Sequence, residues 1–287
     1  MTEKEKEFVD PNELHASEKR QWQEQLADQV ERLQSVNEEL KAARDQAIEA
    51  NRTKSQFVAN ISHEIRTPMS GVLGTLDLLL NEPNISKKES RELIELAFQA
   101  ANSLMYIVND LLDFSKLEAG RTQIVETNID LIAILEEVIQ TISPSAKKKE
   151  LEITNQIDDE LRALSLVADG RLIKQILLNF AHNAVKFTST GSVHFQIQQL
   201  EANEKDKTLT IKFLVKDTGI GIASKDKDKL CQPFVQADGS TTRKFGGTGL
   251  GLSLCRGYAK LLGGKMGFDS EVNQGSTFWF AIPTKVS

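Results

Sequence analysis

Residues 57–68, which read FVANISHEIRTP, place His63 directly beside the carboxylate of Glu64. An imidazole with a neighbouring carboxylate can act as a nucleophile, because the carboxylate accepts or orients the proton on the second ring nitrogen. Thr67 follows one helical turn after His63 on the same face, and Pro68 comes next. The run predicts a reactive histidine on a helix that can bend, since Pro68 deprives the Glu64 carbonyl of its helical donor.

Asn179, Asn183 and Lys186 form a second group of polar side chains, spaced four and three residues apart. On a helix this spacing directs all three side chains the same way. Amide oxygens suit a hard cation such as Mg²⁺, and a nearby ammonium suits phosphate oxygens. Taken alone, the group fits a polar helix face better than a nucleotide site.

Asp217 stands at the end of a predicted strand and is followed by Gly219 and Gly221. A carboxylate at a strand end can accept a hydrogen bond from an amino group such as N6 of adenine. The glycines would let the backbone approach a flat ring closely. Taken alone, these residues describe an ordinary turn.

Residues 246–251, which read GGTGLG, lie directly before a predicted helix. Closely spaced glycines at a helix N-terminus present backbone N–H groups and the positive end of the helix dipole to phosphates. The run is not a Walker A sequence, because no Gly-Lys-Ser/Thr follows, and it is not a Rossmann turn, because no strand leads into it. Such loops are common, so the run alone is a weak signal.

The composition sets limits on the kind of protein this is. A chain of 287 residues is long enough for roughly two domains. Its net charge of −6 argues against a nucleic-acid partner, which normally requires a basic face. The two isolated cysteines, Cys231 and Cys255, indicate a reducing cytosol and fit no metal site.

Targeting signals are also lacking. No run reaches the roughly 18 uninterrupted apolar residues that cross a bilayer, and the charged residues 1–10 do not resemble a signal peptide. We therefore expect a cytoplasmic location without membrane contact in this sequence. The same features fit the cytosolic part of an inner-membrane sensor.

A long helix must carry the histidine run. Residues 17–62 contain no proline or glycine, and apolar positions recur every seven residues, as at Leu26, Leu33 and Leu40. Alternating spacings of three and four residues predict a coiled coil, most simply a parallel dimer. A single solvated charged helix is the alternative.

A helical hairpin is expected to follow. The first helix continues beyond Pro68 and ends at residues 81–84, where Asn and Pro interrupt the pattern. A second helix carries the apolar seam Leu93, Ala97, Ala100, Leu104, Ile107, Leu111 and Phe114. Such a hairpin cannot bury both faces alone, but two copies can form a four-helix bundle.

The remainder of the chain mixes helices and strands. We predict helices over residues 130–142, 169–187 and 248–262, and strands over 151–157, 192–200, 208–217, 265–270 and 276–282. A polar turn over residues 201–207 would join an antiparallel pair of strands. This pattern indicates an α+β layer.

The histidine run and the three clusters together resemble the sensor histidine kinases of two-component systems. The matching runs are the phosphoacceptor box at residues 62–68, the N box at 179–188, the first glycine box at 217–221, the F box at 231–236 and the second glycine box at 247–252. The resemblance covers residues 55–283. The boxes are most similar to those of bacterial hybrid kinases, which often carry receiver domains.

The resemblance implies an α+β protein with three parts. Residues 1–54 would be a signalling coiled-coil helix, and residues 55–121 a helical-hairpin dimerisation and histidine phosphotransfer domain, which forms a four-helix bundle in the dimer. Residues 122–287 would be an α/β-sandwich ATP-binding catalytic domain of the histidine kinase/gyrase/Hsp90 type. The protein would be a homodimer through the coiled coil and the hairpin.

The implied activity is autophosphorylation of His63 from Mg-ATP, with Glu64 as the base. The phosphoryl group would pass to an aspartate of a receiver domain, in a response regulator or in a hybrid kinase. In the family, a threonine at the position of Thr67 positions water for dephosphorylating the partner, which implies phosphatase activity as well.

The resemblance also implies the nucleotide site. The residues implied in ATP binding are Asn179, Asn183, Lys186, Phe187, Asp217, Gly219, Gly221, Phe234, Gly247, Thr248, Gly249, Leu250 and Gly251. Asn183, helped by Asn179, would hold Mg²⁺, and Lys186 and the glycine-rich loop would contact the phosphates. Asp217 would read adenine.

A lid over the nucleotide is implied between the two glycine boxes, at residues 221–246, with Phe234 as its anchor. Arg243 and Lys244 lie in this lid. That they reach the γ-phosphate is an extrapolation from their charge and position.

Two other functions remain as alternatives. The same ATP-binding fold serves other enzymes, so an ATPase or a serine kinase is one, against which the acceptor run and the coiled coil argue. A non-catalytic dimerisation scaffold is the other, against which the presence of His63 and Asn183 argues. His182 departs from the usual N box, and a helix-surface position without an assigned role is the favoured interpretation.

Overall fold

The computed structural model describes residues 11–82, 85–203, 208–227, 230 and 249–286. The chain divides into two compact units, Met1–Val58 and Ala59–Ser287. Within the described residues, no helix is long and apolar enough to cross a membrane.

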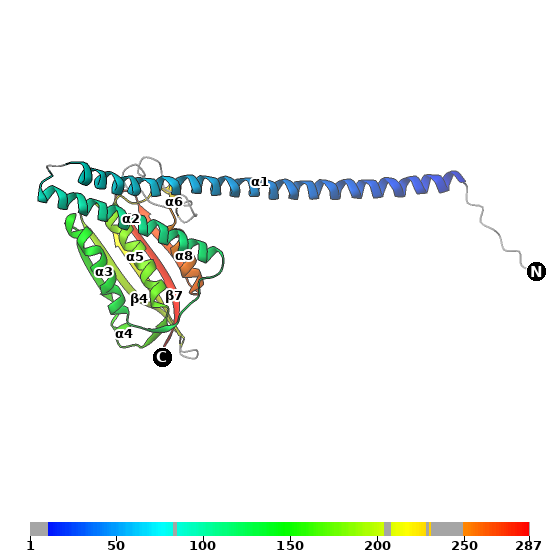
Figure 1. Ribbon diagram of the computed structural model, residues 1–287. Helices are drawn as coiled ribbons and strands as arrows, with labels where there is room; N and C mark the ends of the chain where they lie inside the picture. Colours follow the sequence, from blue (N-terminus) through cyan, green and yellow to red (C-terminus); the bar gives the residue numbers. More distant parts are fainter. Residues whose placement is uncertain (1–10, 83–84, 204–207, 228–229, 231–248, 287) are drawn as a thin grey trace, which may run out of the picture. The chain divides into compact units, whose positions relative to one another are not determined.

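The first unit is helical throughout its described part, because α1 begins at Pro11 and runs to Asn81 (Figure 1). The predicted long helix is therefore confirmed. Its apolar seam is exposed in the single chain, with Leu26, Leu33 and Leu40 between 61% and 68% accessible. The pairing of this seam in a coiled coil stays a prediction.

In the second unit, the end of α1 and helix α2 (Lys87–Glu118) form the predicted hairpin (Figure 1). A capping box starts α2: the Ser86 hydroxyl accepts from the Glu89 amide, and the Glu89 carboxylate accepts from the Ser86 amide. The helices approach closely, since a Cβ built on Gly71 would lie 3.6 Å from the Cβ of Ala100. The predicted seam of α2 is half-buried in the hairpin.

A mixed seven-stranded sheet forms the rest of the second unit, in the order β1-β3-β7-β5-β4-β2 with β6 beside β7. The strands are β1 (Thr127–Ile129), β2 (Glu152–Ile157), β3 (Leu166–Ala168), β4 (Ser192–Asn203), β5 (Thr208–Asp217), β6 (Lys265–Glu271) and β7 (Gly275–Val286). Only β2 and β4 pair in parallel among these strands. The predicted α+β class is therefore observed.

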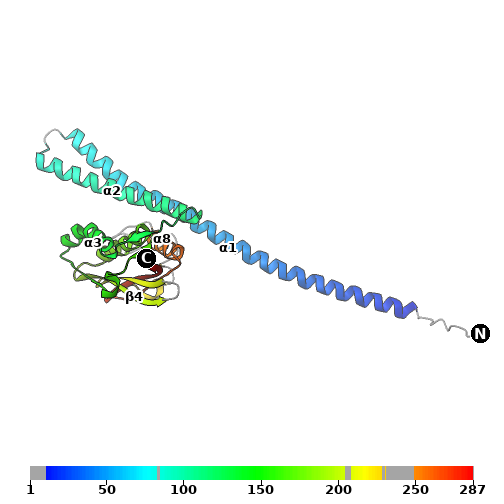
Figure 2. The same ribbon diagram turned by 90° about the horizontal axis from the view of Figure 1, so that it is seen from below.

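Helices pack against one face of this sheet, as Figure 2 shows for α3 and α8 opposite β4. The described helices that follow the hairpin are α3 (Leu131–Lys148), α4 (Asp159–Arg162), α5 (Gly170–Phe187), α6 (Ser224–Lys227) and α8 (Gly251–Leu261), and of these α3, α4, α5 and α8 contact strands of the sheet. Phe180 of α5 meets Phe280 of β7, whose ring stacks on Phe213 of β5 at a centroid distance of 4.5 Å. Each such buried side chain stabilises the fold by roughly 1.5–3 kcal/mol. This core fixes the end of α5 beside the end of β5.

Several predicted elements differ from the observed ones. Helix α3 continues to Lys148 instead of ending at Ile142, although Pro144 lies inside it. Buried Ile142 and Ala146 hold the helix on both sides of the proline, so packing overrides the local penalty. Strand β4 likewise extends to Asn203, through a bulge, where a turn was predicted. Strands β1 and β3 and helix α4 are too short for periodicity to reveal.

Candidate functional site

The acceptor run lies in the part of α1 that belongs to the second unit. His63 is exposed and Glu64 is half-buried, so the imidazole is accessible from solvent. The Thr67 hydroxyl donates to the His63 carbonyl at 3.1 Å. Helix α1 continues through Pro68. A solvent-facing histidine beside a carboxylate is therefore held on a continuous helix.

Helix α5 carries the first cluster. The Asp169 carboxylate caps its start by accepting from the Leu172 amide. Near its end, the Asn183 amide donates to the side-chain oxygen of Asn179 at 3.1 Å, as expected for residues four apart. The ammonium of Lys186 lies 4.9 Å from the centre of the Phe187 ring. Half-buried Asn183 and Lys186 therefore lie on one side of the helix end.

These amides fit a hard cation. Asn183 uses its Nδ2 in the bond to Asn179, which leaves the Oδ1 of Asn183 as the atom suited to a metal. The start of α8 packs tightly on the same group, because a Cβ on Gly251 would lie 2.2 Å from the Nδ2 of Asn179. The chemistry of this donor set suits Mg²⁺ that is also held by phosphate oxygens.

The acceptor run and the N-box helix affect each other electrostatically. Burial, the larger influence, lowers the pKa of Lys186, and the negative charge of Glu64 raises it. Charges interact measurably in this way only at short range. The carboxylate beside His63 therefore lies near the ammonium predicted to contact phosphate.

Asp217 is the buried acid of the second cluster, at the end of β5, and is 5% exposed. Its Oδ1 accepts from the Gly219 amide at 2.8 Å and from the Ser276 amide at 3.3 Å. Burial raises the pKa of this carboxyl, and the two amide bonds partly oppose that shift. Among the described residues, no donor is hydrogen-bonded to Oδ2, so Oδ2 can accept from a ligand.

The glycines after Asp217 allow close backbone contacts. A Cβ on Gly219 would lie 2.6 Å from the carbonyl oxygen of Phe187, which also accepts from the Ile220 amide at 3.3 Å. Gly221 has a φ of +66°, and its Cβ would lie 1.9 Å from the carbonyl oxygen of Glu271. No other residue type would fit here without displacing the backbone.

Sequence reasoning missed a serine pair that supports Asp217. The Ser270 hydroxyl bonds Ser276 at 2.9 Å and the Gly275 carbonyl at 2.9 Å, and it accepts from the Ile222 amide. Ser276 pairs with Asp217 across β5 and β7. The small residues at 275–277 are the one feature of the sequence that could have indicated this contact. They do not predict the register that places Ser276 opposite Asp217.

Thr188 is the last residue of the N-box run and is not among the predicted site residues. Its hydroxyl is buried and has no hydrogen-bond partner in the part of the chain that the structure describes. Buried hydroxyls are normally paired. This atom therefore suits a bound water or a polar ligand group.

The third cluster is only partly described. Gly249 has a φ of +68°, Leu250 is fully buried, and α8 begins at Gly251, later than the predicted residue 248. The Ser253 hydroxyl donates to the Leu250 carbonyl at 2.7 Å. This helix start can present its first amides to an anion. The predicted residues Phe234, Arg243, Lys244, Gly247 and Thr248 lie outside the described residues.

His182 occupies an exposed position on α5, in accord with the helix-surface interpretation. Its ring meets Tyr106 of α2 edge-on, with centroids 6.1 Å apart. It is therefore a contact residue between α5 and α2 of the hairpin.

Comparisons with known proteins agree with these features. Residues 53–120 match the His Kinase A (phospho-acceptor) domain, and residues 168–286 match the histidine kinase-, DNA gyrase B- and HSP90-like ATPase family. The matched regions contain the acceptor run and the nucleotide clusters, respectively.

Two curated relatives are similar over most of the chain. The signal transduction histidine-protein kinase BarA of Escherichia coli K12 is 38% identical over 258 residues, which is 90% of this chain and 28% of BarA. The sensor histidine kinase GacS of Pseudomonas protegens is 39% identical over 261 residues, with the same coverage of 90% and 28%. The chain thus spans little more than a quarter of the length of these relatives.

Solved structures are similar as well. Full-length ShkA in complex with AMPPNP is 32% identical, with a TM-score of 0.58 over 80% of this chain and 46% of ShkA. The domain matches, the relatives and the site geometry agree: the chain contains the phosphoacceptor and ATP-binding domains of a histidine kinase. It belongs to the sensor histidine kinases of two-component signal transduction.

Proposed function

We propose that the chain is a kinase core in which His63 takes the γ-phosphoryl group of Mg-ATP and passes it to an aspartate of a receiver domain. One observation carries this proposal: exposed His63 beside Glu64 belongs to the same unit as buried Asp217, whose Oδ2 remains for a ligand. The interaction between Glu64 and Lys186 supports it, because it joins the acceptor side to the phosphate side.

In this proposal each nucleotide contact has a chemical reason. The Oδ2 atom of Asp217 accepts from the adenine amino group, and the backbone at Gly219 and Gly221 lies against the base. Asn183 and Asn179 would hold Mg²⁺, which when bound would supply charge neutralisation to the phosphates. The Lys186 ammonium and the amides at 249–251 contact phosphate oxygens.

The transfer step requires one nucleophile and one base. A ring nitrogen of His63 attacks the γ-phosphorus, the nitrogen–phosphorus bond forms, and the bond to the bridging oxygen breaks as ADP leaves with its electron pair. Glu64 accepts or orients the proton on the other ring nitrogen, which favours the reactive tautomer. A receiver aspartate then attacks phosphorus, and the electron pair of the nitrogen–phosphorus bond returns to the imidazole.

A homodimer is part of the proposal, because the hairpin exposes a second apolar stripe beside its half-buried seam. Its residues are Met69, Leu73, Leu76 and Leu80 on α1 and Ile94, Phe98, Met105 and Leu112 on α2, each 45% to 83% exposed. A second copy covers such a stripe in a four-helix bundle. The seam of α1 in the first unit would pair in the same dimer as a parallel coiled coil.

Phosphatase activity toward the receiver is a second proposed activity. Thr67 lies one turn after His63, and its hydroxyl is bonded to the His63 carbonyl at 3.1 Å. Rotation about its side-chain bond would release this hydroxyl to hold a water near the phosphoryl group of a docked partner. Loss of receiver dephosphorylation in Thr67→Ala with retained autophosphorylation tests this role; equal dephosphorylation excludes it.

The stability of the bound phosphate tests the proposed kinase chemistry. We expect label transferred from γ-labelled ATP to be lost in acid and retained in alkali, as for a phosphoramidate. Acid-stable label would indicate a serine or threonine kinase, and hydrolysis of ATP without bound label would indicate an ATPase.

A further inference from the structure

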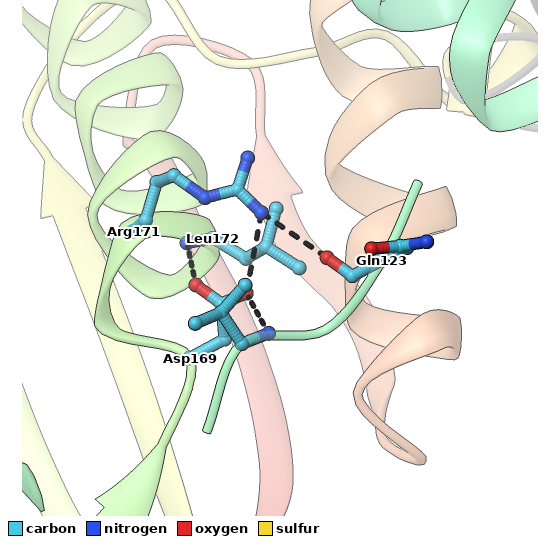
Figure 3. Close-up of polar contacts among 5 residues, drawn as sticks. Gln123, Asp169, Arg171 and Leu172 are labelled. Carbon is cyan, nitrogen blue, oxygen red and sulfur yellow. Dashed lines mark hydrogen bonds and ion pairs between the residues drawn. The ribbon is translucent and has the colours of Figure 1, made fainter. Parts of the chain in front are cut away.

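Residues 123–126 form a strap that leads from the end of α2 into β1. Figure 3 shows the Arg171 guanidinium between the Asp169 carboxylate and the Gln123 carbonyl. Its Nη2 donates to each at 3.3 Å, and the Asp169 Oδ2 also accepts from the Val125 amide at 2.9 Å. Two residues at the start of α5 therefore hold the strap at two backbone positions.

Polar contacts, more than apolar burial, hold the strap in place. Ile124 is 42% and Val125 is 55% exposed, and a cavity of about 170 Å³ lies beside Ile124 and Asp169. Asp169 itself is 1% exposed, so the bond that it accepts from the Val125 amide is charge-assisted and partly shielded from water, whereas the Arg171 side chain is 63% exposed. The Lys285 ammonium anchors Glu126 at 2.7 Å, where the strap enters β1. Removing the polar contacts would therefore release the strap.

The other side of the strap is fixed by the end of α2. The Arg121 amide bonds the Lys116 carbonyl at 2.8 Å, and Gly120 has a φ of +63°, which together form a Schellman ending. Among the described residues, no hydrogen bond or ion pair holds Thr122. Thr122 is therefore the joint between the dimerisation helix and the ATP-binding domain.

We propose that Asp169 and Arg171 form a clamp that keeps this joint short, and that Arg171 is thereby a positioning residue for phosphoryl transfer to His63. The proposal rests on the function proposed above. With the clamp closed, the joint is Thr122 alone, about 3.5 Å of chain. With it open, residues 122–125 are released, or about 14 Å at the same rise per residue.

A longer joint lets the ATP-binding domain explore more space and lowers the effective concentration of its nucleotide at the acceptor. Phosphoryl transfer between tethered groups depends on that concentration and on orientation. Arg171 precedes Asn179 by eight residues, or about 12 Å along α5, so its loss should leave ATP affinity unchanged. The expected signature is a lower rate at saturating ATP with an unchanged KM for ATP.

A second contact near the clamp needs a control. Tyr258 of α8 lies near Asp113 of α2. Burial first and then Asp113 raise the pKa of the Tyr258 hydroxyl, and the charge of Arg171 lowers it. Replacing Arg171 therefore also changes the surroundings of this contact. Tyr258→Phe removes the hydroxyl near Asp113 and leaves the clamp intact.

The test compares Arg171→Met with the control Lys174→Met. Lys174 lies about one turn after Arg171 on α5, and the control removes its ion pair with Glu137 of α3. Asp169→Asn is a second clamp variant: its Oδ1 still accepts from Leu172, but its amide nitrogen cannot accept from Val125. Wild type and every variant are made in the whole chain. For each, we measure amide hydrogen exchange over residues 123–126, ATP affinity, and the rate of His63 phosphorylation at saturating ATP.

We expect both clamp variants to exchange the Val125 amide at least about tenfold faster. The rate of His63 phosphorylation should fall about three- to tenfold with ATP affinity within about twofold of wild type. Lys174→Met and Tyr258→Phe should leave the Val125 exchange unchanged. Unchanged exchange in the clamp variants, or faster exchange with an unchanged rate, would overturn the proposal. A wild-type chain that takes no label on His63 would instead refute the proposed function itself.

Discussion

The carboxylate of Asp217 accepts the Gly219 amide through Oδ1 at 2.8 Å, and the bond from Ser276 reaches the same oxygen. This arrangement uses one carboxylate oxygen for structure and leaves the other for a ligand. Because β5 ends at Asp217 and β7 begins opposite it, the sheet fixes the direction of Oδ2. Asp217 therefore combines a structural and a binding role that substitution can separate.

Replacing Asp217 by Asn should separate these roles. The Oδ1 atom of the amide can still accept from Gly219 and Ser276. The amide nitrogen that replaces Oδ2 is a donor, and it repels the adenine amino group. We expect ATP affinity to fall at least about tenfold, or ~1.4 kcal/mol. The thermal stability of the unliganded protein should hold or rise, since a buried charge is removed. Calorimetric titration and thermal unfolding measure both; wild-type affinity in this variant would exclude the adenine contact.

The raised pKa of Asp217 gives ATP binding a dependence on acid pH. A raised pKa means that the folded chain favours the neutral carboxyl, so protonation begins above the ordinary value of 3.8. ATP affinity should fall as the pH drops through this window, because the ionised form is the acceptor. The effect of Asp217 on folding has the opposite sign. Lowering the pH protonates the buried carboxyl, removes a buried charge and so raises the free energy of unfolding. Titrations of wild type and Asp217→Asn against pH check this: the variant should show no such decline.

Gly221 should not tolerate a side chain. Gly221→Ala forces a Cβ against the carbonyl of Glu271 at a positive φ, and we expect a loss of about 1–3 kcal/mol in unfolding free energy. Gly74→Ala is the matched control, because its Cβ meets nothing within 4 Å and lies inside a helix. That change should stabilise by up to about 1 kcal/mol. Denaturant unfolding of the two variants measures the contrast, and equal effects would contradict it.

The exposed stripe of the hairpin should control the oligomeric state. Phe98 is 67% exposed in the single chain, and in the proposed bundle each copy would bury it. Phe98→Glu places two charges in that interface, which we expect to cost several kcal/mol, on the order of 3–5, as for buried unpaired charges. Sedimentation should show a dimer for wild type and for Gln99→Glu, and a monomer for Phe98→Glu. A dimeric Phe98→Glu would remove the hairpin from the proposed interface.

The sequence predicted the elements with strong periodicity. Helices α1 and α2 carry long apolar repeats, α5 is amphipathic and β5 alternates between apolar and polar residues, so their positions were predicted closely. Strands β1 and β3 each span three residues, which is too few to show the apolar/polar alternation that identifies a strand.

The candidate site was predicted to the extent that its residues are close in sequence. Asn179 and Asn183 were paired correctly from helical spacing. Ser276 was not found beside Asp217, because 59 residues separate them and strand register joins them. The contact between Asp169 and Val125 was not predicted either, since 44 residues separate them and no periodicity in the sequence links the two.

The central claim is that His63 receives the γ-phosphoryl group of ATP. The most direct measurement incubates wild type and His63→Gln with γ-labelled ATP and Mg²⁺, after titration has shown that both bind ATP equally. The account predicts acid-labile label on wild type and none on His63→Gln. Equal label on the two proteins would contradict it.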